Sequence, residues 1–331
     1  LRRARPYPAV VAADLRIIYP ALRARSRVHV APGALDALGP LTRRATGAAR
    51  VVVVSDARVA GLHGDRAIRS LRRAGLTADL VLVPRGERAK RPQVVLRLWA
   101  LLSALGLSRR DAIVALGGGA VGDLAGCAAA TWLRGVAWVC GPTTLLAQVD
   151  SSVGGKTGID LGAGKNLVGA FHQPVLVVTD PEVLATLPPR QRRAGLAELV
   201  KMGMAVDARL FRRLERHAGL LAAGEPAALA SAVRAGVAAK ARVVRRDERE
   251  REGGVRTALN FGHTLGHAIE AARGFRGILH GEAVAIGMRA AARLSEQRAG
   301  LAPSHHARLD ALLCTQTHSA PSAAASGDKC L

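Results

Sequence analysis

A chain of 331 residues with 49% hydrophobic side chains is long enough for about two domains with buried cores. This excludes a disordered or fibrous protein for most of its length, and aromatic residues at 3% argue against surfaces that stack nucleic-acid bases. The net charge of +23 comes from basic residues scattered singly and in pairs, so we expect no nucleic-acid partner.

Several features of the sequence bear on its cellular compartment. The four cysteines form no CxxC pair, which favours a reducing environment. Asp123 and Arg134 interrupt the longest apolar stretch before it reaches the roughly 18 residues that a membrane span needs. The basic start of the chain runs into Pro6 and Pro8 and not into the apolar segment of a signal peptide. We therefore expect a cytoplasmic protein with no membrane partner.

Five short apolar runs in the first half have the composition of buried parallel strands. They lie at residues 51–54, 80–83, 112–116, 136–139 and 175–178. Apolar residues with helical spacing separate them, as in the segment that contains Val94, Leu98 and Leu101. We therefore predict an α/β domain of alternating strands and helices, which ends between residues 180 and 190.

The pattern changes after Pro188 and Pro189. From Arg190 onward the apolar residues recur with a period near 3.6 and no run is typical of a strand, so we predict a helical domain. We interpret residues 245–254 as a solvated charged elbow. The sequence from Cys314 to the end has no periodicity, which predicts a disordered tail.

A GxGxxG spacing at residues 117–122 follows one predicted strand. Glycines at such a turn let the backbone approach a pyrophosphate at the start of the next helix, although a tight turn with no ligand explains the same spacing. Asp56 follows another strand, where it could hold a ribose, and Glu87 and Lys90 follow a third. These residues are expected at the sheet edge where ligands collect.

A second glycine-rich segment covers residues 143–166. A Walker A loop would need glycine where Asp150 stands, so we exclude a P-loop nucleotide triphosphatase. Lys156, Lys165 and Asn166 remain, and ammonium and amide groups on such a loop suit a phosphorylated, hydroxyl-rich small molecule. A merely polar loop is the alternative, but the whole chain has only six lysines and two asparagines.

Glu198 and Lys201 are three residues apart, so they share one face of a helix whose apolar neighbours predict burial. Asn260, His263 and His267 are spaced as one stripe of another helix, and His280 begins a third.

One glutamate with two or three histidines makes an open metal site possible. The HExxH pattern of zinc proteases is absent. A single histidine in such a helix would more often be a core or capping residue.

Long motifs in this chain resemble the 3-dehydroquinate synthase family. They are GGGAVGDLAG, RGVAW, PTTLLAQVDSSVGGKTGIDLGAGKNLVGAFHQP, TLPPRQRRAGLAELVKMG, NFGHTLGHAIE and LHGEAVAIGM, within a resemblance that runs from about residue 27 to about residue 300. The resemblance implies a Rossmann-like NAD-binding α/β domain at 1–185, an all-helical metal- and substrate-binding domain at 186–313, truncated, and a low-complexity tail at 314–331. It also implies a homodimer.

The resemblance implies a role for each matching residue. Residues that match the family's divalent metal ligands, usually for zinc and sometimes for cobalt, are Glu198, His263 and His280. Residues that match contacts to the sugar-phosphate substrate are Arg134 from the neighbouring subunit, Lys156, Asn166, Lys240, Arg256, Asn260 and His267. Residues that match NAD contacts are Asp56, Glu87, Lys90, Gly118, Gly119, Asp123, Thr143, Thr144 and Lys165. The catalytic set is Asp150, Lys156, Lys201, Asn260 and His267.

The reaction implied by the resemblance converts 3-deoxy-D-arabino-heptulosonate 7-phosphate to 3-dehydroquinate and phosphate. NAD oxidises the substrate transiently at C5, phosphate is eliminated, the hydride returns, and an aldol closure forms the ring. Within the fold, a metal-dependent polyol dehydrogenase is one alternative. A second is another sugar-phosphate cyclase, such as 2-epi-5-epi-valiolone synthase, against which Arg256 and Asn260 argue. An inactive homologue is a third.

Two departures from the family pattern affect these expectations. The segment between Lys240 and Arg256 is two residues longer than the pattern, which affects the register of Arg256. The family's later basic segment, with a further phosphate-binding lysine, is replaced by the tail, which holds only Lys329. Because the chain also lacks an initiator methionine, we expect a fragment or a frame disruption. Because the further phosphate-binding lysine is missing, we expect weakened substrate binding.

Overall fold

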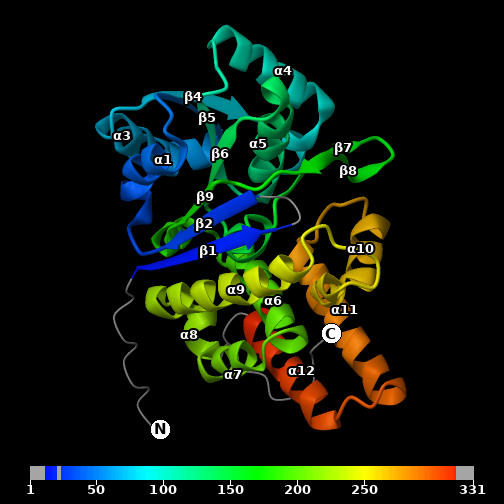
Figure 1. Cartoon of the computed structure of the whole chain (residues 1–331). Coiled ribbons are helices and arrows are strands. Elements are labelled where there is room, and N and C mark those ends of the chain that lie inside the picture. Colours follow the sequence, from blue (N-terminus) through cyan, green and yellow to red (C-terminus); the bar gives the residue numbers. More distant parts are fainter. Residues whose placement is uncertain (1–11, 21–23, 318–331) are drawn as a thin grey trace.

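The computed structural model describes residues 12–20 and 24–317 and consists of a sheet-containing half and a helical half (Figure 1). The main sheet has seven strands in the order β1-β2-β9-β6-β5-β3-β4. Its strands are β1 (Ala13–Tyr19), β2 (Ala24–Val30), β3 (Arg50–Asp56), β4 (Thr77–Val83), β5 (Ala112–Gly117), β6 (Ala137–Pro142) and β9 (Leu176–Thr179). Strands β7 (Lys156–Leu161) and β8 (Gly164–Phe171) form a separate hairpin.

Twelve α-helices accompany these strands in the described residues. In the first half they are α1 (Leu38–Thr46), α2 (Ala57–Val59), α3 (Asp65–Arg73), α4 (Pro92–Ala104) and α5 (Gly119–Thr131). In the second half they are α6 (Pro189–Ala205), α7 (Ala208–Arg216), α8 (Ala218–Ala223), α9 (Pro226–Arg246), α10 (His263–Ala272), α11 (His280–Arg298) and α12 (Pro303–Thr317). Short 3-10 helices cover Ala34–Ala37, Gly86–Lys90, Trp132–Arg134, Pro181–Thr186 and Val255–Asn260, and π-helical turns cover Ala60–Gly64 and Ala147–Ser151.

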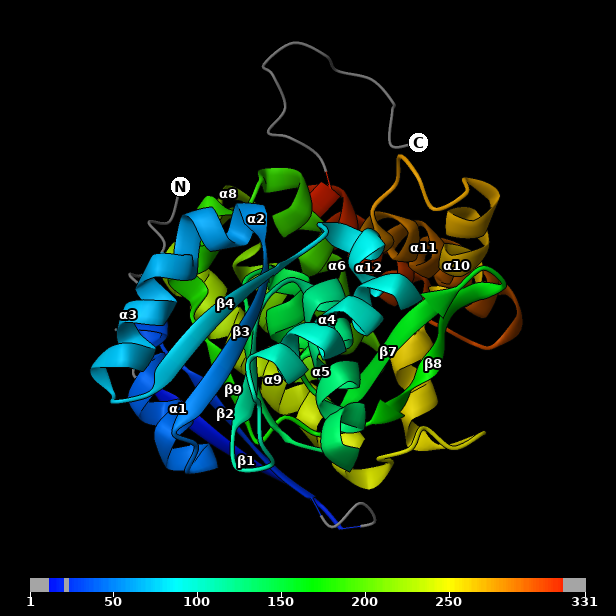
Figure 2. The ribbon, with the colours of Figure 1, turned by 90° about the horizontal axis from the view of Figure 1, so that it is seen from above.

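The predicted α/β class is confirmed. All five predicted apolar runs form strands of the main sheet, and every pair among them that is hydrogen-bonded is parallel. Val51, Val52, Val53 and Val54 of β3 are completely buried, because helices cover both faces of the sheet (Figure 2). A strand that is buried on both sides needs a continuous apolar run, which is why the sequence predicted it.

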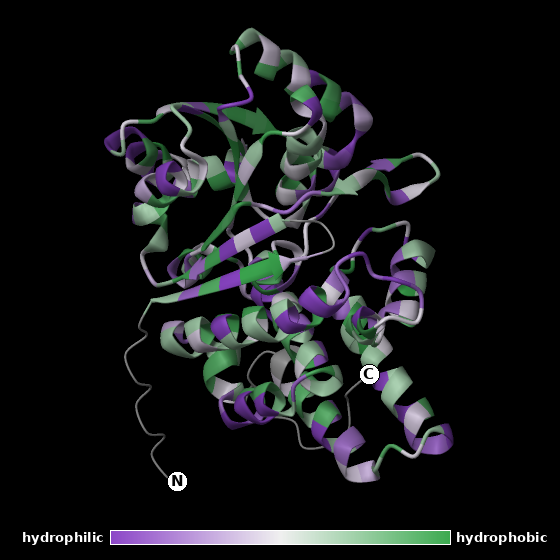
Figure 3. Ribbon diagram, viewed as in Figure 1, coloured by the Kyte–Doolittle hydropathy of each residue, from purple (hydrophilic) through white to green (hydrophobic). Residues whose placement is uncertain are grey.

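The hairpin of β1 and β2 was not predicted. It adds β1 antiparallel to β2 at one edge of the sheet, and β2 pairs parallel with β9. Polar and apolar residues alternate along both strands (Figure 3), and on the exposed face Asp14 pairs with Arg27 at 2.5 Å and with His29 at 2.8 Å. An edge hairpin with one solvated face needs only this alternation, which is a weaker signal than an apolar run.

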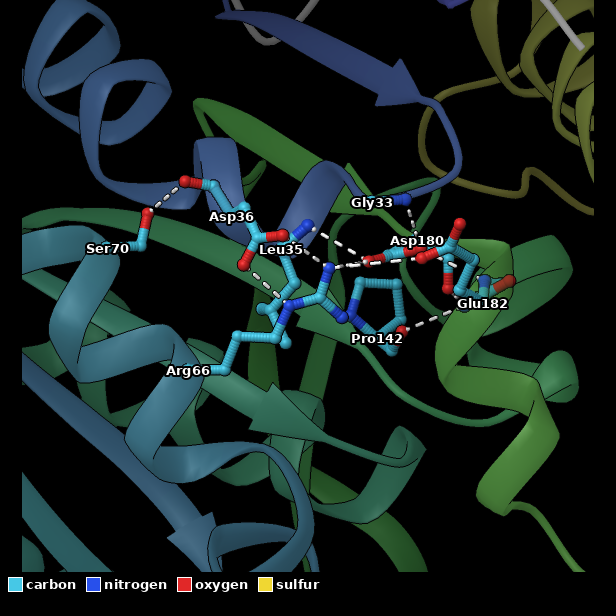
Figure 4. Close-up of polar contacts among 9 residues, drawn as sticks. Gly33, Leu35, Asp36, Arg66, Ser70, Pro142, Asp180 and Glu182 are labelled. Atoms are coloured by element: carbon cyan, nitrogen blue, oxygen red, sulfur yellow. Dashed lines mark hydrogen bonds and ion pairs between the residues drawn. The ribbon is translucent and has the colours of Figure 1, made fainter.

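Asp180, directly after β9, connects distant parts of the first half (Figure 4). Its buried carboxylate accepts hydrogen bonds from the backbone nitrogens of Gly33 at 3.0 Å, Leu35 at 3.1 Å and Glu182 at 3.0 Å. Arg66 lies 3.5 Å from the same carboxylate. Asp180 therefore fixes the loop after β2 beside the segment that leads into the helical half.

The helical half contains no strand in the residues that the structure describes, as predicted. One of the expectations for it is wrong, and another is only partly confirmed. α12 continues through Thr317, so residues 314–317 are helical and not disordered as predicted; Leu309, Leu312 and Leu313 are buried and hold the helix in place. Lys329 and the rest of residues 318–331 lie outside the described residues.

The elbow at 245–254 is solvated only in part: residues 245, 246, 249 and 251–253 are exposed, as predicted, whereas two of its carboxylates are not. Asp247 and Glu248 are buried, and Asp247 accepts hydrogen bonds from the backbone nitrogens of Arg251 at 3.0 Å and Arg256 at 3.3 Å. Carboxylates that bond to the backbone hold the chain in a fixed turn.

The β7–β8 hairpin extends from the sheet-containing half alongside α10 (Figures 1 and 2). Its strands approach so closely that a Cβ atom at Gly169 would lie 1.9 Å from the carbonyl oxygen of Thr157, so only glycine fits there. No helix among the described residues is long and apolar enough to cross a membrane.

Candidate active site

Two cavities lie next to each other between the two halves. One has a volume of about 690 Å³ and the other about 650 Å³. Both are lined by Asp123, Asp150, Asn166, His267 and His280, so a ligand in one would face a ligand in the other. All nine residues predicted to contact NAD line the larger cavity, and eight of the nine predicted substrate or catalytic residues line the smaller one.

The larger cavity opens at the turn between β5 and α5, where the predicted GxGxxG spacing lies. Gly118 caps α5, and Cβ atoms at Gly118 and Gly119 would lie 3.2 Å from Thr144 and 3.0 Å from Ser151. The hydroxyl of Thr143 is buried without a hydrogen-bond partner in the described residues. A helix N-terminus, side-chain-free backbone and an unpaired hydroxyl together fit the pyrophosphate of a dinucleotide.

Asp56 lies at the carboxyl end of β3 and caps α2 through Oδ1, which accepts hydrogen bonds from the backbone nitrogens of Arg58 and Val59. Lys90 is almost fully buried, and its Nζ lies 2.9 Å from Asp123 and 3.6 Å from Asp160. Burial raises the pKa of Asp123 although Lys90 opposes this. The sequence analysis missed Asp160, because a carboxylate inside an unpredicted hairpin gives no signal of its own.

The predicted metal ligands gather where α6, α10 and α11 meet. Oε1 of Glu198 lies 3.7 Å from Nε2 of His280 and 4.0 Å from Nε2 of His263. Glu198 is completely buried, and this oxygen has no hydrogen-bond donor in the described part of the chain. Burial, and then the charge of Lys201, lower the pKa of His263 to about 4, so its imidazole is neutral. A buried carboxylate with one oxygen that lacks a hydrogen-bond donor, beside a neutral imidazole, fits a divalent cation.

A third imidazole lies in the same cluster. The ring nitrogens of His263, His267 and His280 lie within 4.8 Å of one another, so these three also form a possible ligand set. Asn260 does not share their helix, contrary to the prediction. Asn260 is the last residue of a 3-10 helix. Gly262, with a φ of +80°, is in the left-handed conformation and separates that 3-10 helix from α10, which begins at His263.

Glu270 is a member of this site that the sequence analysis missed. Its Oε2 lies 3.0 Å from Nδ1 of His280, which leaves Nε2 facing Glu198. Burial lowers the pKa of His280, but the contact with Glu270 and the charge of Glu198 outweigh it and raise the pKa. The spacing of Glu270, three residues after His267 on one helix, could have identified it.

Buried lysines and an arginine line the smaller cavity beside the histidines. Lys240 donates to the backbone oxygen and to Oδ1 of Asp150, each at 2.6 Å, and Lys201 pairs with Glu198. Burial would raise the pKa of Asp150, but Lys240 and Lys201 outweigh this and hold it below its usual range. Asp150 is therefore ionised.

Lys156 lies at the outer part of the same cavity. Partial burial and the charges of Arg256 and Lys240 lower its pKa to about 8. Arg256 is 3% exposed and donates to the backbone oxygen of Glu248 at 2.8 Å. Such a concentration of positive charge favours an anionic ligand.

Arg134 is the one predicted substrate contact that lines neither cavity. It is exposed, with a φ of +68°, in the turn after α5.

The fold and the two adjoining cavities define the class of protein. The structure of 2-deoxy-scyllo-inosose synthase complexed with carbaglucose-6-phosphate, NAD+ and Co2+ has a TM-score of 0.84 and 30% identity, covering 92% of this chain and 81% of that one. The structure of 2-epi-5-epi-valiolone synthase from Streptomyces hygroscopicus with NAD+ and Zn2+ has a TM-score of 0.79 and 31% identity, covering 89% and 82%. The chain therefore has the fold of the sugar-phosphate cyclases.

Sequence comparison assigns the chain to one family within that class. Models of the 3-dehydroquinate synthase N-terminal and C-terminal regions match residues 80–194 and 195–325. The enzyme named 3-dehydroquinate synthase from Rhodospirillum rubrum is 51% identical over 287 residues, which are 86% of this chain and 74% of that protein. The one from Symbiobacterium thermophilum is 48% identical over 272 residues, 82% and 75% respectively. The chain belongs to the 3-dehydroquinate synthase family, as its motifs predicted.

Proposed function

We propose that this chain converts 3-deoxy-D-arabino-heptulosonate 7-phosphate to 3-dehydroquinate and phosphate, with NAD and a divalent cation as cofactors. Relatives about half identical in sequence carry the name of this activity. The observation that carries the proposal is the junction of the two cavities. The one with dinucleotide-binding features meets the one with cationic side chains at His267, His280 and Asp150.

The residues around the β5–α5 turn would hold NAD, and Glu198, His263 and His280 would hold the cation. When bound, NAD supplies a reversible hydride acceptor and the cation supplies Lewis-acid polarisation of substrate hydroxyls. Glu270 orients the imidazole of His280 so that Nε2 faces the cluster. The structural relatives named with NAD+ and Co2+ or Zn2+ support both cofactors.

The cationic side chains would bind the two anionic groups of the substrate. Arg256 presents a planar guanidinium, which suits a carboxylate, and Lys240 lies in the same cavity. Lys156, Asn166, Asn260 and His267 would surround the phosphate and its neighbouring hydroxyls. Asp150 is ionised, so its carboxylate can accept a hydrogen bond from a substrate hydroxyl where the reaction takes place.

Arg134 would complete the phosphate site of a second subunit in a homodimer. Its exposure and its position outside both cavities support this role. The buried Cys127 and Cys140 are free thiols, which supports a cytoplasmic location. The division into domains at residues 185 and 313 stays a prediction.

Another sugar-phosphate cyclase activity is the second candidate, favoured by the two structural relatives with about 30% identity. The buried Arg256 favours a substrate that carries a carboxylate. Glycerol dehydrogenase from Schizosaccharomyces pombe, with a TM-score of 0.64 and 15% identity, shares only the fold. NMR identification of the product formed from heptulosonate phosphate tests the proposal directly. 3-Dehydroquinate supports it, and no product from this substrate, with turnover of a hexose phosphate instead, contradicts it.

A further inference from the structure

The carboxylate of Glu250 lies inside the cavity assigned to the substrate. Its Oε2 forms an ion pair with Nζ of Lys156 and lies 4.0 Å from Nε of Arg256. Its Oε1 accepts a hydrogen bond from Nδ2 of Asn260 at 3.3 Å. All three partners were predicted to bind the substrate, and all four residues line this cavity.

The charges in the cavity explain why an acidic side chain lies there. Lys201 pairs with Glu198, and Lys240 pairs with Asp150. Lys156, Arg249 and Arg256 also line this cavity, and Glu250 is a carboxylate that the described structure places beside both Lys156 and Arg256. Glu250 thus supplies the negative charge that a bound anion would otherwise provide.

The backbone at Glu250 shows that this side chain is held in place by its segment. Glu250 has a φ of +51°, in the left-handed region that disfavours residues other than glycine. Asp247, three residues before Glu250, fixes the turn by accepting hydrogen bonds from the backbone nitrogens of Arg251 and Arg256, which both follow this glutamate in the sequence. The neighbouring Glu252 is exposed. Of the three glutamates in this turn, Glu248, Glu250 and Glu252, only Glu250 lines the cavity.

We propose that Glu250 is a specificity-determining residue whose carboxylate occupies an anion subsite of the substrate-free protein. An entering anion must displace it from Lys156 and Arg256 before either can bind the ligand. A neutral sugar cannot replace the lost ion pairs, so Glu250 selects for ligands that bring a negative charge of their own. The identity of the full substrate rests on the proposed function, but the subsite itself does not.

The anion that fits this subsite is either a carboxylate or a phosphate, since both pair with a guanidinium and an ammonium group. A titration calorimeter can distinguish them without turnover. The full chain, loaded with NAD and Zn2+, is titrated separately with inorganic phosphate and with gluconate, a hydroxylated carboxylate. Glu250→Gln keeps the size of the side chain and removes its charge, and Glu252→Gln removes a charge from the exposed neighbour.

We expect Glu250→Gln to bind at least one of the two anions about fivefold or more tightly than the unaltered chain, and Glu252→Gln to bind both unchanged. Tightening for phosphate alone assigns a phosphate subsite, tightening for gluconate alone a carboxylate subsite, and tightening for both a shared one. Unchanged or weaker binding of both anions would overturn the inference, because a structural counter-ion holds its cations in place and its loss weakens the site.

Two additions keep this result interpretable. Glu250→Gly removes the carboxylate while suiting the left-handed backbone, so it provides the same comparison if the glutamine variant does not fold. Turnover of heptulosonate phosphate is measured in parallel. If Glu250→Gln binds an anion more tightly but the unaltered chain shows no turnover, the subsite is supported and the proposed function is rejected. If the unaltered chain turns over the substrate but Glu250→Gln leaves anion binding unchanged, the proposed function is supported and the subsite is rejected.

Discussion

Nδ1 of His280 lies 3.0 Å from Oε2 of Glu270, and this contact turns the other ring nitrogen of His280 toward Glu198. A carboxylate behind a ligating histidine fixes the orientation of the ring and increases its basicity. Glu270 would therefore act on a bound cation through His280, by determining the direction in which Nε2 of that histidine points.

Glu270→Ala should weaken zinc binding by about 10- to 100-fold, because His280 loses the partner that orients it. Metal titration with a competing chelator measures this. Glu296→Ala is the matched control: Glu296 contacts Nδ1 of His306 at 2.5 Å, with the same spacing of ten residues, but lies outside both cavities. An equal loss of zinc affinity in Glu270→Ala and Glu296→Ala would show that the effect of Glu270 is not specific to the site.

The ligand set can be decided by removing one side chain at a time. Alanine at Glu198, His263 or His280 should empty the metal site and abolish turnover, while His267→Ala should lower activity and keep the metal. The reason is that the buried Glu198 has an oxygen with no donor in the described structure, and a cation would satisfy it. Metal content by mass spectrometry checks this. A variant at Glu198 that keeps its metal, with loss at His267, would establish the three-histidine set instead.

The affinity for the anionic substrate should fall as the pH rises through about 8. The pKa of Lys156 is about 8 because partial burial and the charges of Arg256, Lys240 and Lys201 oppose its protonation, although Asp150 favours it. Above that pH the lysine is neutral and no longer attracts an anion, so kcat/KM, which reports the free enzyme, should decline. Lys156→Arg keeps its charge and should move this decline to higher pH. A decline that stays in place in the arginine variant would assign it to another group.

Asp180→Ala should destabilise the fold by about 3 kcal/mol, since three backbone nitrogens lose a buried acceptor and Arg66 loses a partner (Figure 4). Denaturant unfolding measures the change. Glu182→Ala removes an exposed carboxylate 3.9 Å from the same Arg66 and should cost less than about 0.5 kcal/mol. A loss for Asp180→Ala no larger than the control would mean that its network adds nothing to stability.

The sequence predicted those parts of the protein in which the local pattern of residues is compatible with only one secondary structure. The run of valines in β3 predicted a strand in the interior of the sheet, and helical spacing predicted α4 and the second half. The scarcity of lysine in an arginine-rich chain was also informative. Five of the six lysines line the two cavities: Lys90, Lys156, Lys165, Lys201 and Lys240.

The remaining features depend on contacts that no short pattern contains. Asn260 has the spacing of a helical stripe with His263, but the left-handed Gly262 separates them. Glu250 is indistinguishable from its neighbours within a run of alternating charges until the turn at Asp247 places it beside Lys156. Glu270 becomes part of the site only because α11 brings His280 against α10.

The central claim is that a cofactor cavity and an anion cavity act on one substrate, so that the hydride taken from it is returned to it. The most direct measurement follows inorganic phosphate release and NADH absorbance together, while the chain turns over heptulosonate phosphate with NAD+ and zinc. We predict that phosphate release requires NAD+ and continues over many turnovers while NADH does not accumulate. NADH that grows in step with turnover would contradict the account and assign the chain a net dehydrogenase activity.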